Sequence, residues 1–354
     1  MKLKKLLLTL IVLILLLPYQ QINAESESPD ITAGAALLMD SKTSKILYSK
    51  NENEKMYPAS TTKIMTAILT IENCNLDDIV TVPYDAIATI PSGYSIAALQ
   101  TGEQLTVNQL LQLMMVHSAN DAANVLAFHV AGSIESFATM MNTKVAELGL
   151  EHTHFLNPSG MHNEDHYTTA YDLAKLMQYC MKNSTFRTIA GLKFCTVPAT
   201  NKYGERIFTS TNELLTLVDN RNVASNYYYK YAIAGKTGYT TEAKNCLVSV
   251  SNKDGFELIS VILSVGVYPN NISGKFVETK SLFNYGYDNY TLRKLREKDA
   301  IATQVEVGNG TKETKNLDLL ISDDITATIK QSDFNTEFEP EIQINENLHA
   351  PIAQ

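Results

Sequence analysis

The sequence predicts an α+β fold, with an antiparallel sheet, flanking helices and a helical insertion. Segments with strand patterns lie near both ends of residues 33–265, and helical patterns gather between them. Strands followed by helices and then by further strands are typical of α+β domains. Because ligands bind in the crevices of such domains, we expect a site between the sheet and the helical insertion.

The first strands form a predicted β-hairpin. Residues 33–39 and 45–49 have strand patterns, and a turn is expected at 40–44. A helix is then expected to begin near Ser60, because an apolar run follows that residue. From there the chain is expected to be largely helical to about residue 182.

Strands are predicted again after residue 193. They are expected at 194–199, 206–210, 229–237, 245–251 and 256–265. Hairpins that are distant in the sequence can form one antiparallel sheet, and residues 280–287 are expected to close against it as a helix. From about residue 295 the composition changes to short alternating segments with turns between them, which predicts a short β-rich C-terminal domain over 295–354.

The N-terminus has the pattern of a signal peptide. Three lysines precede the apolar run Leu6–Leu17, and Ile22-Asn23-Ala24 is an acceptable cleavage site. The apolar run is short for a membrane span, so a single uncleaved anchor is the less favoured alternative. We therefore expect a leader at residues 1–24 and a secreted protein.

The chain is acidic. Its formal net charge is −9, and it becomes −12 without the leader, which holds three lysines and no acidic residue. Such a protein is a poor candidate for binding nucleic acid or an anionic membrane surface. The sequence also lacks a basic amphipathic tail, so no stable membrane anchor is expected.

No cofactor and no metal are expected from the cysteines and histidines. The cysteines show no close pairing and no Cys-x-x-Cys, and they are expected to be free buried thiols; they are Cys74, Cys180, Cys195 and Cys246. The histidines of His152-x-His154 and of the segment from His162 to His166 lack the His-Glu-x-x-His order of zinc peptidases.

Ser60-Thr61-Thr62-Lys63 is the first of three motifs that suit serine acyl transfer. Serine attacks well only when a neighbouring base takes its proton. Positions i and i+3 of a helix lie on one face, so the Lys63 amine can approach the Ser60 hydroxyl. Lysine acts as a base only when its pKa falls, through burial or a second cation, for which Lys236 is the candidate. Taken alone, the motif also fits a serine N-cap with an exposed lysine.

Ser118-Ala119-Asn120 is the second motif, and it is expected in a short loop between two helices. Thr106–Gln109 has the pattern of a capping box that opens one helix, and the other is expected to begin at Asp121. The Ser118 hydroxyl would relay a proton to the leaving nitrogen, and the Asn120 amide would hydrogen-bond the substrate backbone. An ordinary turn between helices is the alternative.

Lys236-Thr237-Gly238 is the third motif, and it lies on a predicted strand. Gly235 and Gly238 leave room for a ligand to approach the backbone, so a substrate can lie there as an added strand. Lys236 and Thr237 would offer a cation and a hydroxyl group to a carboxylate. A strand-end turn with a solvated lysine is the alternative. The three motifs are too far apart in the chain to meet locally, so only a folded domain can unite them.

The three motifs resemble those of the serine-type D-alanyl-D-alanine carboxypeptidases, the low-molecular-mass penicillin-binding protein family. The likeness covers about residues 31–290 and includes Tyr57–Lys63, Asn157–Gly160 and His166–Ala174. It implies a DD-peptidase and β-lactamase-like fold, with a penicillin-binding transpeptidase-like catalytic domain at residues 25–294. Compared with the family, the β-rich C-terminal domain is expected to be truncated.

The resemblance implies catalytic roles for four residues. Ser60 would form the acyl-enzyme and Lys63 would be its base, while Ser118 and Asn120 would assist. The oxyanion hole would consist of the backbone N–H groups of Ser60 and Tyr239, aimed at the tetrahedral oxygen.

The resemblance also implies how the substrate is held. Lys236 and Thr237 would bind the terminal carboxylate, next to Tyr239. Lys275 aligns with an arginine of the family, and lysine cannot make the bidentate contact of arginine.

The implied substrate is a peptidoglycan stem peptide that ends in D-Ala-D-Ala, cleaved in the cell-wall space, with β-lactams as covalent inhibitors. A β-lactamase and a non-enzymatic penicillin-binding sensor are the alternatives. Class A β-lactamases activate the deacylating water with the acid of a Glu-x-x-Leu-Asn segment. Here Leu156-Asn157 is preceded by Thr153 at the position of that acid, so we expect β-lactams to inhibit the protein and not to be destroyed by it.

Overall fold

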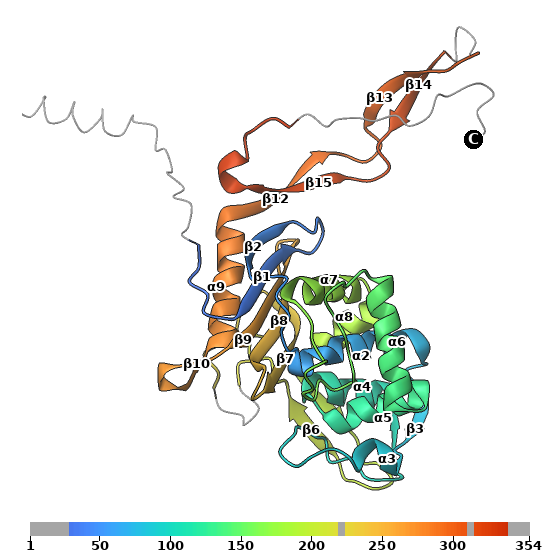
Figure 1. The fold of residues 1–354 in the computed structure, drawn as a ribbon. Coiled ribbons are helices and arrows are strands. Elements are labelled where there is room, and N and C mark those ends of the chain that lie inside the picture. Colours follow the sequence, from blue (N-terminus) through green and yellow to red (C-terminus); the bar gives the residue numbers. More distant parts are fainter. Residues whose placement is uncertain (1–27, 219–223, 310–314, 339–354) are drawn as a thin grey trace, which may run out of the picture.

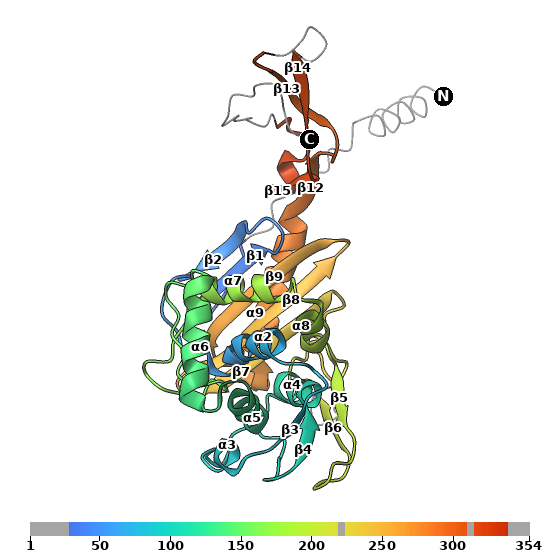
Figure 2. The same ribbon diagram turned by 90° about the vertical axis from the view of Figure 1, so that its right-hand side faces the viewer.

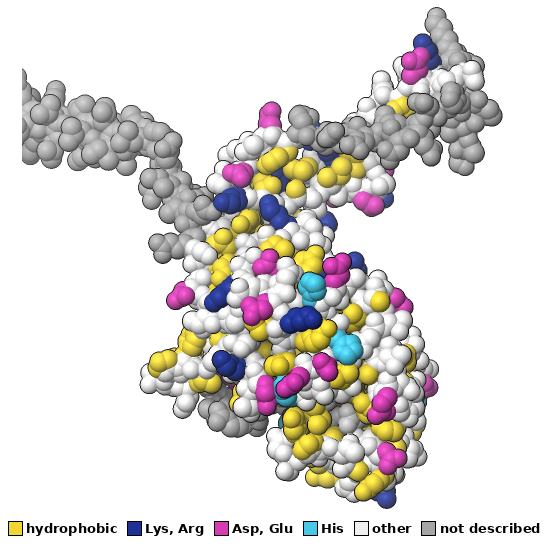
Figure 3. All heavy atoms as spheres, viewed as in Figure 1, with side chains coloured by type: hydrophobic (Ala, Val, Ile, Leu, Met, Phe, Trp, Pro, Cys, Tyr) yellow, Lys and Arg dark blue, Asp and Glu magenta, His cyan; other side chains and the backbone are white. Residues whose placement is uncertain are grey.

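The computed structural model describes residues 28–218, 224–309 and 315–338. The leader expected at residues 1–24 lies outside the described residues, and so does the end of the expected C-terminal domain, from residue 339 onward. Within the described ranges no helix is both long enough and apolar enough to cross a bilayer. Acidic and basic side chains are interspersed over the face that Figure 3 shows, without a broad basic area.

A five-stranded antiparallel sheet forms the centre of the fold, in the order β2-β1-β9-β8-β7. The strands are β1 (Ala35–Asp40), β2 (Ile46–Lys50), β7 (Ala232–Thr240), β8 (Lys244–Lys253) and β9 (Phe256–Val265). The N-terminal hairpin therefore pairs with strands from the far end of the chain, since β1 lies against β9. This arrangement confirms the predicted α+β fold and the joining of distant hairpins into one sheet (Figure 1).

Helices cover both faces of the sheet. Figure 1 shows α9 (Gly274–Asn289) on one side and the helical lobe on the other, and Figure 2 looks onto the helical lobe. The larger helices of the lobe are α2 (Lys63–Asn73), α4 (Val107–Val116), α5 (Asn120–Ala131), α6 (Ile134–Glu147), α7 (Ala170–Cys180) and α8 (Ser184–Ala190), beside the short α3 (Tyr84–Ile87). Helix α7 packs on β1 and β9, α8 packs on β7, and α2 lies among the other helices.

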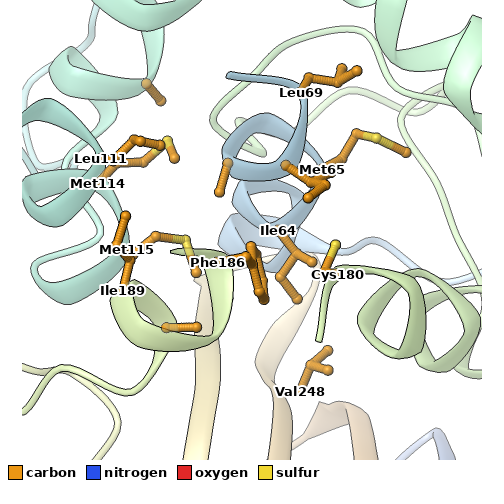
Figure 4. Packing of buried hydrophobic residues seen from close by; sticks show 14 of the residues in the cluster. Ile64, Met65, Leu69, Leu111, Met114, Met115, Cys180, Phe186, Ile189 and Val248 are labelled. Carbon is orange, nitrogen blue, oxygen red and sulfur yellow. The ribbon is translucent and has the colours of Figure 1, made fainter. Parts of the chain in front are cut away.

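Alternation along the strands builds two hydrophobic cores. On β1, Ala35, Leu37 and Met39 face the helical lobe, whereas Ala36 and Leu38 face α9, as the period of two residues requires. Both faces are buried, so the strand is apolar from Ala35 to Met39. Figure 4 shows the first core, in which α2 contributes Ile64, Met65 and Leu69; the other labelled side chains are Leu111, Met114, Met115, Cys180, Phe186, Ile189 and Val248.

Several predicted elements differ from the structure. Strands β5 (Phe194–Val197) and β6 (Arg206–Thr209) form a separate two-stranded sheet beside the helical lobe, not part of the central one. Strand β7 begins and ends three residues later than expected, which places the third motif inside the strand. The closing helix α9 is longer than expected, because it begins at Gly274. A further short pair, β3 (Ile79–Thr81) with β4 (Gln104–Thr106), lies in the helical lobe.

The C-terminal part of the described chain consists of two β-ribbons. They pair β12 (Tyr290–Arg296) with β15 (Ile325–Lys330) and β13 (Ile301–Glu306) with β14 (Asn316–Leu320). Strand β12 continues from α9 across the boundary expected between residues 294 and 295, so the domain boundaries stay a prediction. Thr328 hydrogen-bonds the buried Asp40 carboxylate, which ties the first ribbon to the central sheet.

Candidate active site

The first motif forms a tight turn in front of a helix. Residues Ala59–Thr62 are a 3₁₀ turn, and α2 begins only at Lys63, although a helix was expected to begin near Ser60. Ala59 has a positive φ of 47°, and the Thr61 hydroxyl donates to the Pro58 carbonyl at 2.7 Å. The turn still places Lys63 beside Ser60, because three residues complete one turn of a 3₁₀ helix.

Lys63 is fully buried and has three oxygen partners. Its Nζ lies 2.9 Å from Ser60 Oγ, 2.6 Å from Asn120 Oδ1 and 2.7 Å from the Ser159 carbonyl oxygen. Burial lowers the pKa of Lys63 well below its usual value, and nearby Lys236 lowers it further. A neutral amine has two N–H groups and one lone pair. Because Asn120 and Ser159 offer only acceptors, the lone pair is left for the Ser60 hydroxyl.

The second motif lies in the loop between α4 and α5, as predicted. The expected capping box is present, since Thr106 Oγ1 accepts from Gln109 N and Gln109 accepts from Thr106 N. Ser118 has a positive φ of 63°, and Asn120 N donates to the Ser95 carbonyl at 2.8 Å. Helix α5 begins one residue earlier than expected, at Asn120, so the side-chain amide of Asn120 is carried by the first turn of the helix.

Lys236 lies beneath the cleft and is also buried. Its Nζ donates to Ser118 Oγ and to the Thr237 carbonyl, each at 2.9 Å. Burial lowers the pKa of Lys236 to about 7, with a further contribution from the charge of Lys275. A buried lysine therefore lies beside each of the two serines, and the charge of Lys236 also makes Lys63 easier to deprotonate.

Gly238 lets the third motif touch the nucleophile turn. A Cβ atom at this position would lie 3.0 Å from both the Pro58 carbonyl oxygen and the Ser60 backbone nitrogen. Contacts this short are tighter than most Cβ contacts, so glycine at this position lets the backbone of β7 pass directly beside Ser60. The Tyr239 side chain, next along β7, is 63% exposed and lines the cleft.

A cleft of about 590 Å³ lies over these residues. Its lining includes the end of β7 from Thr237 and the residues that follow it to Glu242, together with the loop Ser92–Ser95, Ser118 and Asn120. Ser60 lies in the lining, whereas Lys63 and Lys236 lie beneath it. Seven residues predicted from sequence are thus brought to one place; they are Ser60, Lys63, Ser118, Asn120, Lys236, Thr237 and Tyr239.

One end of the cleft carries groups that suit a carboxylate. Thr237 Oγ1 lies 2.7 Å from Thr211 Oγ1, and Lys275 lines the same end with its Nζ 3.1 Å from Asn245 Oδ1. Burial lowers the pKa of Lys275, while the nearby Glu213 carboxylate opposes this effect. Both Lys236 and Lys275 contribute positive potential there.

Two contributions to the site were missed by the sequence reasoning. Thr211 follows the β5–β6 hairpin and has no motif of its own, so no local signal identifies it. The second is the Ser159 carbonyl, a backbone atom that contacts Lys63. Asn157–Gly160 was noted only as part of the resemblance to the family, so no role was predicted for this carbonyl.

Comparisons with known proteins agree on one family. A family model described as D-alanyl-D-alanine carboxypeptidase matches residues 22–266. D-alanyl-D-alanine carboxypeptidase DacF of Bacillus subtilis is 29% identical, and the match covers 99% of this chain and 88% of that protein. A D-alanyl-D-alanine carboxypeptidase of a Streptomyces species is 35% identical over 73% of this chain and 88% of its own length.

Solved structures with the same fold include penicillin-binding and DD-peptidase proteins. Penicillin binding protein 5 from Haemophilus influenzae superposes with a TM-score of 0.77 at 28% identity, covering 92% of this chain and 91% of that one. A variant of the Streptomyces K15 DD-transpeptidase has a TM-score of 0.66 at 34% identity, covering 73% of this chain and 99% of its own.

Proposed function

Because this chain belongs to the D-alanyl-D-alanine carboxypeptidase family, we propose that its cleft is where the terminal D-alanine is removed from peptidoglycan stem peptides. The protein is a D-Ala-D-Ala carboxypeptidase, a serine hydrolase, and β-lactam inhibition is characteristic of its family. The roles of individual residues below are our proposal.

The arrangement around Lys63 carries this proposal. Two fixed acceptors take its N–H groups, and the remaining lone pair faces the Ser60 hydroxyl at 2.9 Å. Ser60 Oγ attacks the carbonyl carbon of the penultimate D-alanine, and its proton passes to Lys63 Nζ. The developing oxyanion accepts hydrogen bonds from the backbone N–H groups of Ser60 and Tyr239.

Ser118 supports the departure of D-alanine. Its hydroxyl accepts from Lys236 Nζ and lies in the cleft lining, so it can donate a proton to the leaving nitrogen as the C–N bond breaks. Asn120 holds Lys63 with its Oδ1 and has its Nδ2 free for the substrate backbone. Water then attacks the ester carbonyl of acylated Ser60, which yields the shortened peptide and restores the hydroxyl group.

The terminal carboxylate of the substrate is proposed to bind at the Thr237 end of the cleft. Thr237 and Thr211 offer hydroxyl groups, and Lys236 and Lys275 offer positive charge. With a lysine at residue 275, the carboxylate receives a point charge and not the planar bidentate contact of arginine.

The related cell-wall enzymes imply that this protein acts outside the cytoplasm. We propose further that residues 1–24 are a signal peptide and that the protein is secreted into the cell-wall space. The basic start and the short apolar run of that segment support this proposal.

One experiment tests the proposed function. The protein and its Ser60→Ala variant are incubated separately with a pentapeptide that ends in D-Ala-D-Ala and with penicillin, and D-alanine release, penicillin consumption and covalent labelling are measured. We expect D-alanine release and stable labelling by the native protein, and neither by the variant. Rapid penicillin consumption would indicate a β-lactamase, and labelling without D-alanine release would indicate a sensor.

A further inference from the structure

We propose that His166 is a positioning residue for the acylation step: it holds the Ser159 carbonyl against Lys63 and so keeps the lone pair of Lys63 directed at Ser60. The inference rests on the proposed role of Lys63 as the base. His166 does not touch the substrate site and acts through the loop that follows Leu156.

His166 joins the nucleophile turn to this loop. Its Nε2 lies 2.9 Å from Thr62 Oγ1, next to Lys63 in the sequence, and its Nδ1 accepts from the Leu156 backbone N–H at 3.0 Å. Because Nδ1 is an acceptor there, Nε2 carries the proton and donates to Thr62. The side chain is 2% exposed and lies against the Phe155 ring, so both its position and its tautomer are determined.

The loop itself is a rigid turn. Asn157 Oδ1 accepts from the backbone N–H groups of Ser159, Gly160 and Met161, and from the Ser159 hydroxyl. Gly160 has a φ of +82°, and a Cβ atom there would lie 1.8 Å from the Ala59 carbonyl oxygen. The turn therefore presses on the backbone just before Ser60. Two contacts hold the turn from outside: Thr66 Oγ1 of α2 donates to the Pro158 carbonyl at 2.6 Å, and His166 Nδ1 accepts from the Leu156 N–H. His166 thus fixes the residue that leads into the turn.

A displaced Ser159 carbonyl would change the chemistry of Lys63. One N–H group of the amine would lose its acceptor, and water would enter to solvate the ammonium form. The pKa of Lys63 would then rise toward its ordinary value, because burial is the main cause of its depression. Of the other charges that face Lys63, Lys236 keeps the pKa low and Asp121 raises it, and neither contacts His166.

His166 itself does not titrate in the relevant range. Burial lowers its pKa to about 3, and the neighbouring His154 and His162 contribute in the same direction. It is therefore neutral throughout a measurement between pH 5 and pH 10. A shift of the activity profile in that range therefore does not come from protonation of the His166 imidazole. Besides Lys63, the groups at the site whose pKa is shifted are Lys236, Lys275 and His117, and none of them hydrogen-bonds His166. Both ring nitrogens are also engaged, which leaves no lone pair for a metal.

The test is the pH dependence of acylation by a fluorescent penicillin in His166→Gln and His166→Phe. Glutamine keeps a donor near Thr62, whereas phenylalanine keeps the ring volume and loses both hydrogen bonds. We expect the acidic limb of the acylation rate to move by one pH unit or more in His166→Phe. This corresponds to about a tenfold loss of rate on the acidic limb that is recovered at high pH, since below the pKa each unit of pKa changes the neutral fraction tenfold. His166→Gln should be intermediate.

Controls separate positioning from a general loss of structure. His152→Gln alters an exposed histidine of the same loop and should leave the profile unchanged. If His166→Phe does not fold, Thr62→Val removes the other end of the same hydrogen bond with little change in shape and should shift the limb in the same direction. If the acylation rate of His166→Phe fell by the same factor at every pH, or did not fall at all, the proposal would be overturned. Absence of acylation in the native protein at any pH would instead refute the proposed function.

Discussion

Replacing Lys236 by methionine is expected to stabilise the protein at low pH while removing substrate binding. Lys236 is 1% exposed, and burial lowers its pKa from 10.5 to about 7. Between these values the unfolded chain holds a proton that the folded chain has lost, so the free energy of unfolding rises with pH. Below pH 7 both states carry the proton, and the folded state must bury a charge. The buried lysine therefore destabilises the fold most under acidic conditions.

The two pKa values determine the size of the effect. The cost of lysine relative to a neutral side chain is roughly 5 kcal/mol at pH 6 and about 2 kcal/mol at pH 9, at about 1.4 kcal/mol per pH unit between the two pKa values. Methionine also loses the hydrogen bonds to Ser118 Oγ and to the Thr237 carbonyl, which costs about 1–3 kcal/mol at either pH. We expect a net stabilisation of roughly 2–4 kcal/mol at pH 6 and little change at pH 9.

The assay is urea unfolding of the native protein and Lys236→Met at pH 6 and pH 9. Comparing the two proteins at each pH cancels the titration of distant groups. Lys182→Met, at an exposed lysine between α7 and α8, is the control and should show no such pH dependence. The reasoning is refuted if the stability difference is the same at both pH values, or if it grows toward pH 9.

Four further outcomes are expected. Ser60→Ala should abolish labelling by a fluorescent penicillin with the fold intact by circular dichroism, and retained labelling would show that another residue is acylated. Lys63→Arg should lose acylation nearly as completely as Lys63→Ala, because arginine keeps the charge but cannot give up a proton; an active arginine variant would mean that charge alone suffices. Amidating the terminal carboxylate of the pentapeptide should reduce kcat/KM more in the native protein than in Lys236→Ala, and equal losses would break the proposed contact. Mass spectrometry should show a penicilloyl adduct that lasts many minutes, because a base for water attack contributes about 10²–10⁴-fold and Thr153 stands at the position of that base; an adduct gone within seconds would favour a β-lactamase.

Local patterns predicted most of the central architecture. The strand patterns near both ends of the chain became one antiparallel sheet, and the capping box at Thr106 opened α4 as expected. The hairpin of β5 and β6 was predicted as strands like the central ones, yet it forms a two-stranded sheet of its own beside the helical lobe. Residues of β5 alternate between exposed and buried, whereas β1 is buried on both faces. Alternation reports that one face of a strand is buried, but it does not say which partner buries that face. The sequence therefore could not predict which strands belong to the central sheet.

The groups of the site were predictable to the extent that they are side chains in short motifs. Ser60 and Lys63 are close in the chain, so one turn of 3₁₀ helix brings them together. The Ser159 carbonyl and Thr211 were not predicted, because a backbone oxygen has no sequence signature and a lone threonine has no motif. Only the path of the folded chain places them beside Lys63 and Thr237.

The sequence by itself determined which residues we propose for the chemistry: a serine, two lysines and a second serine, in motifs whose order and types suit acyl transfer. The tertiary structure alone decided the protonation states on which that chemistry depends. Lys63 and Lys236 have low pKa values because helices and strands from distant parts of the chain remove water from both; in addition they place Lys236 near Lys63 and Lys275 near Lys236. Desolvation depends on all the residues that surround a group in the folded protein, so no short segment of the sequence can determine it.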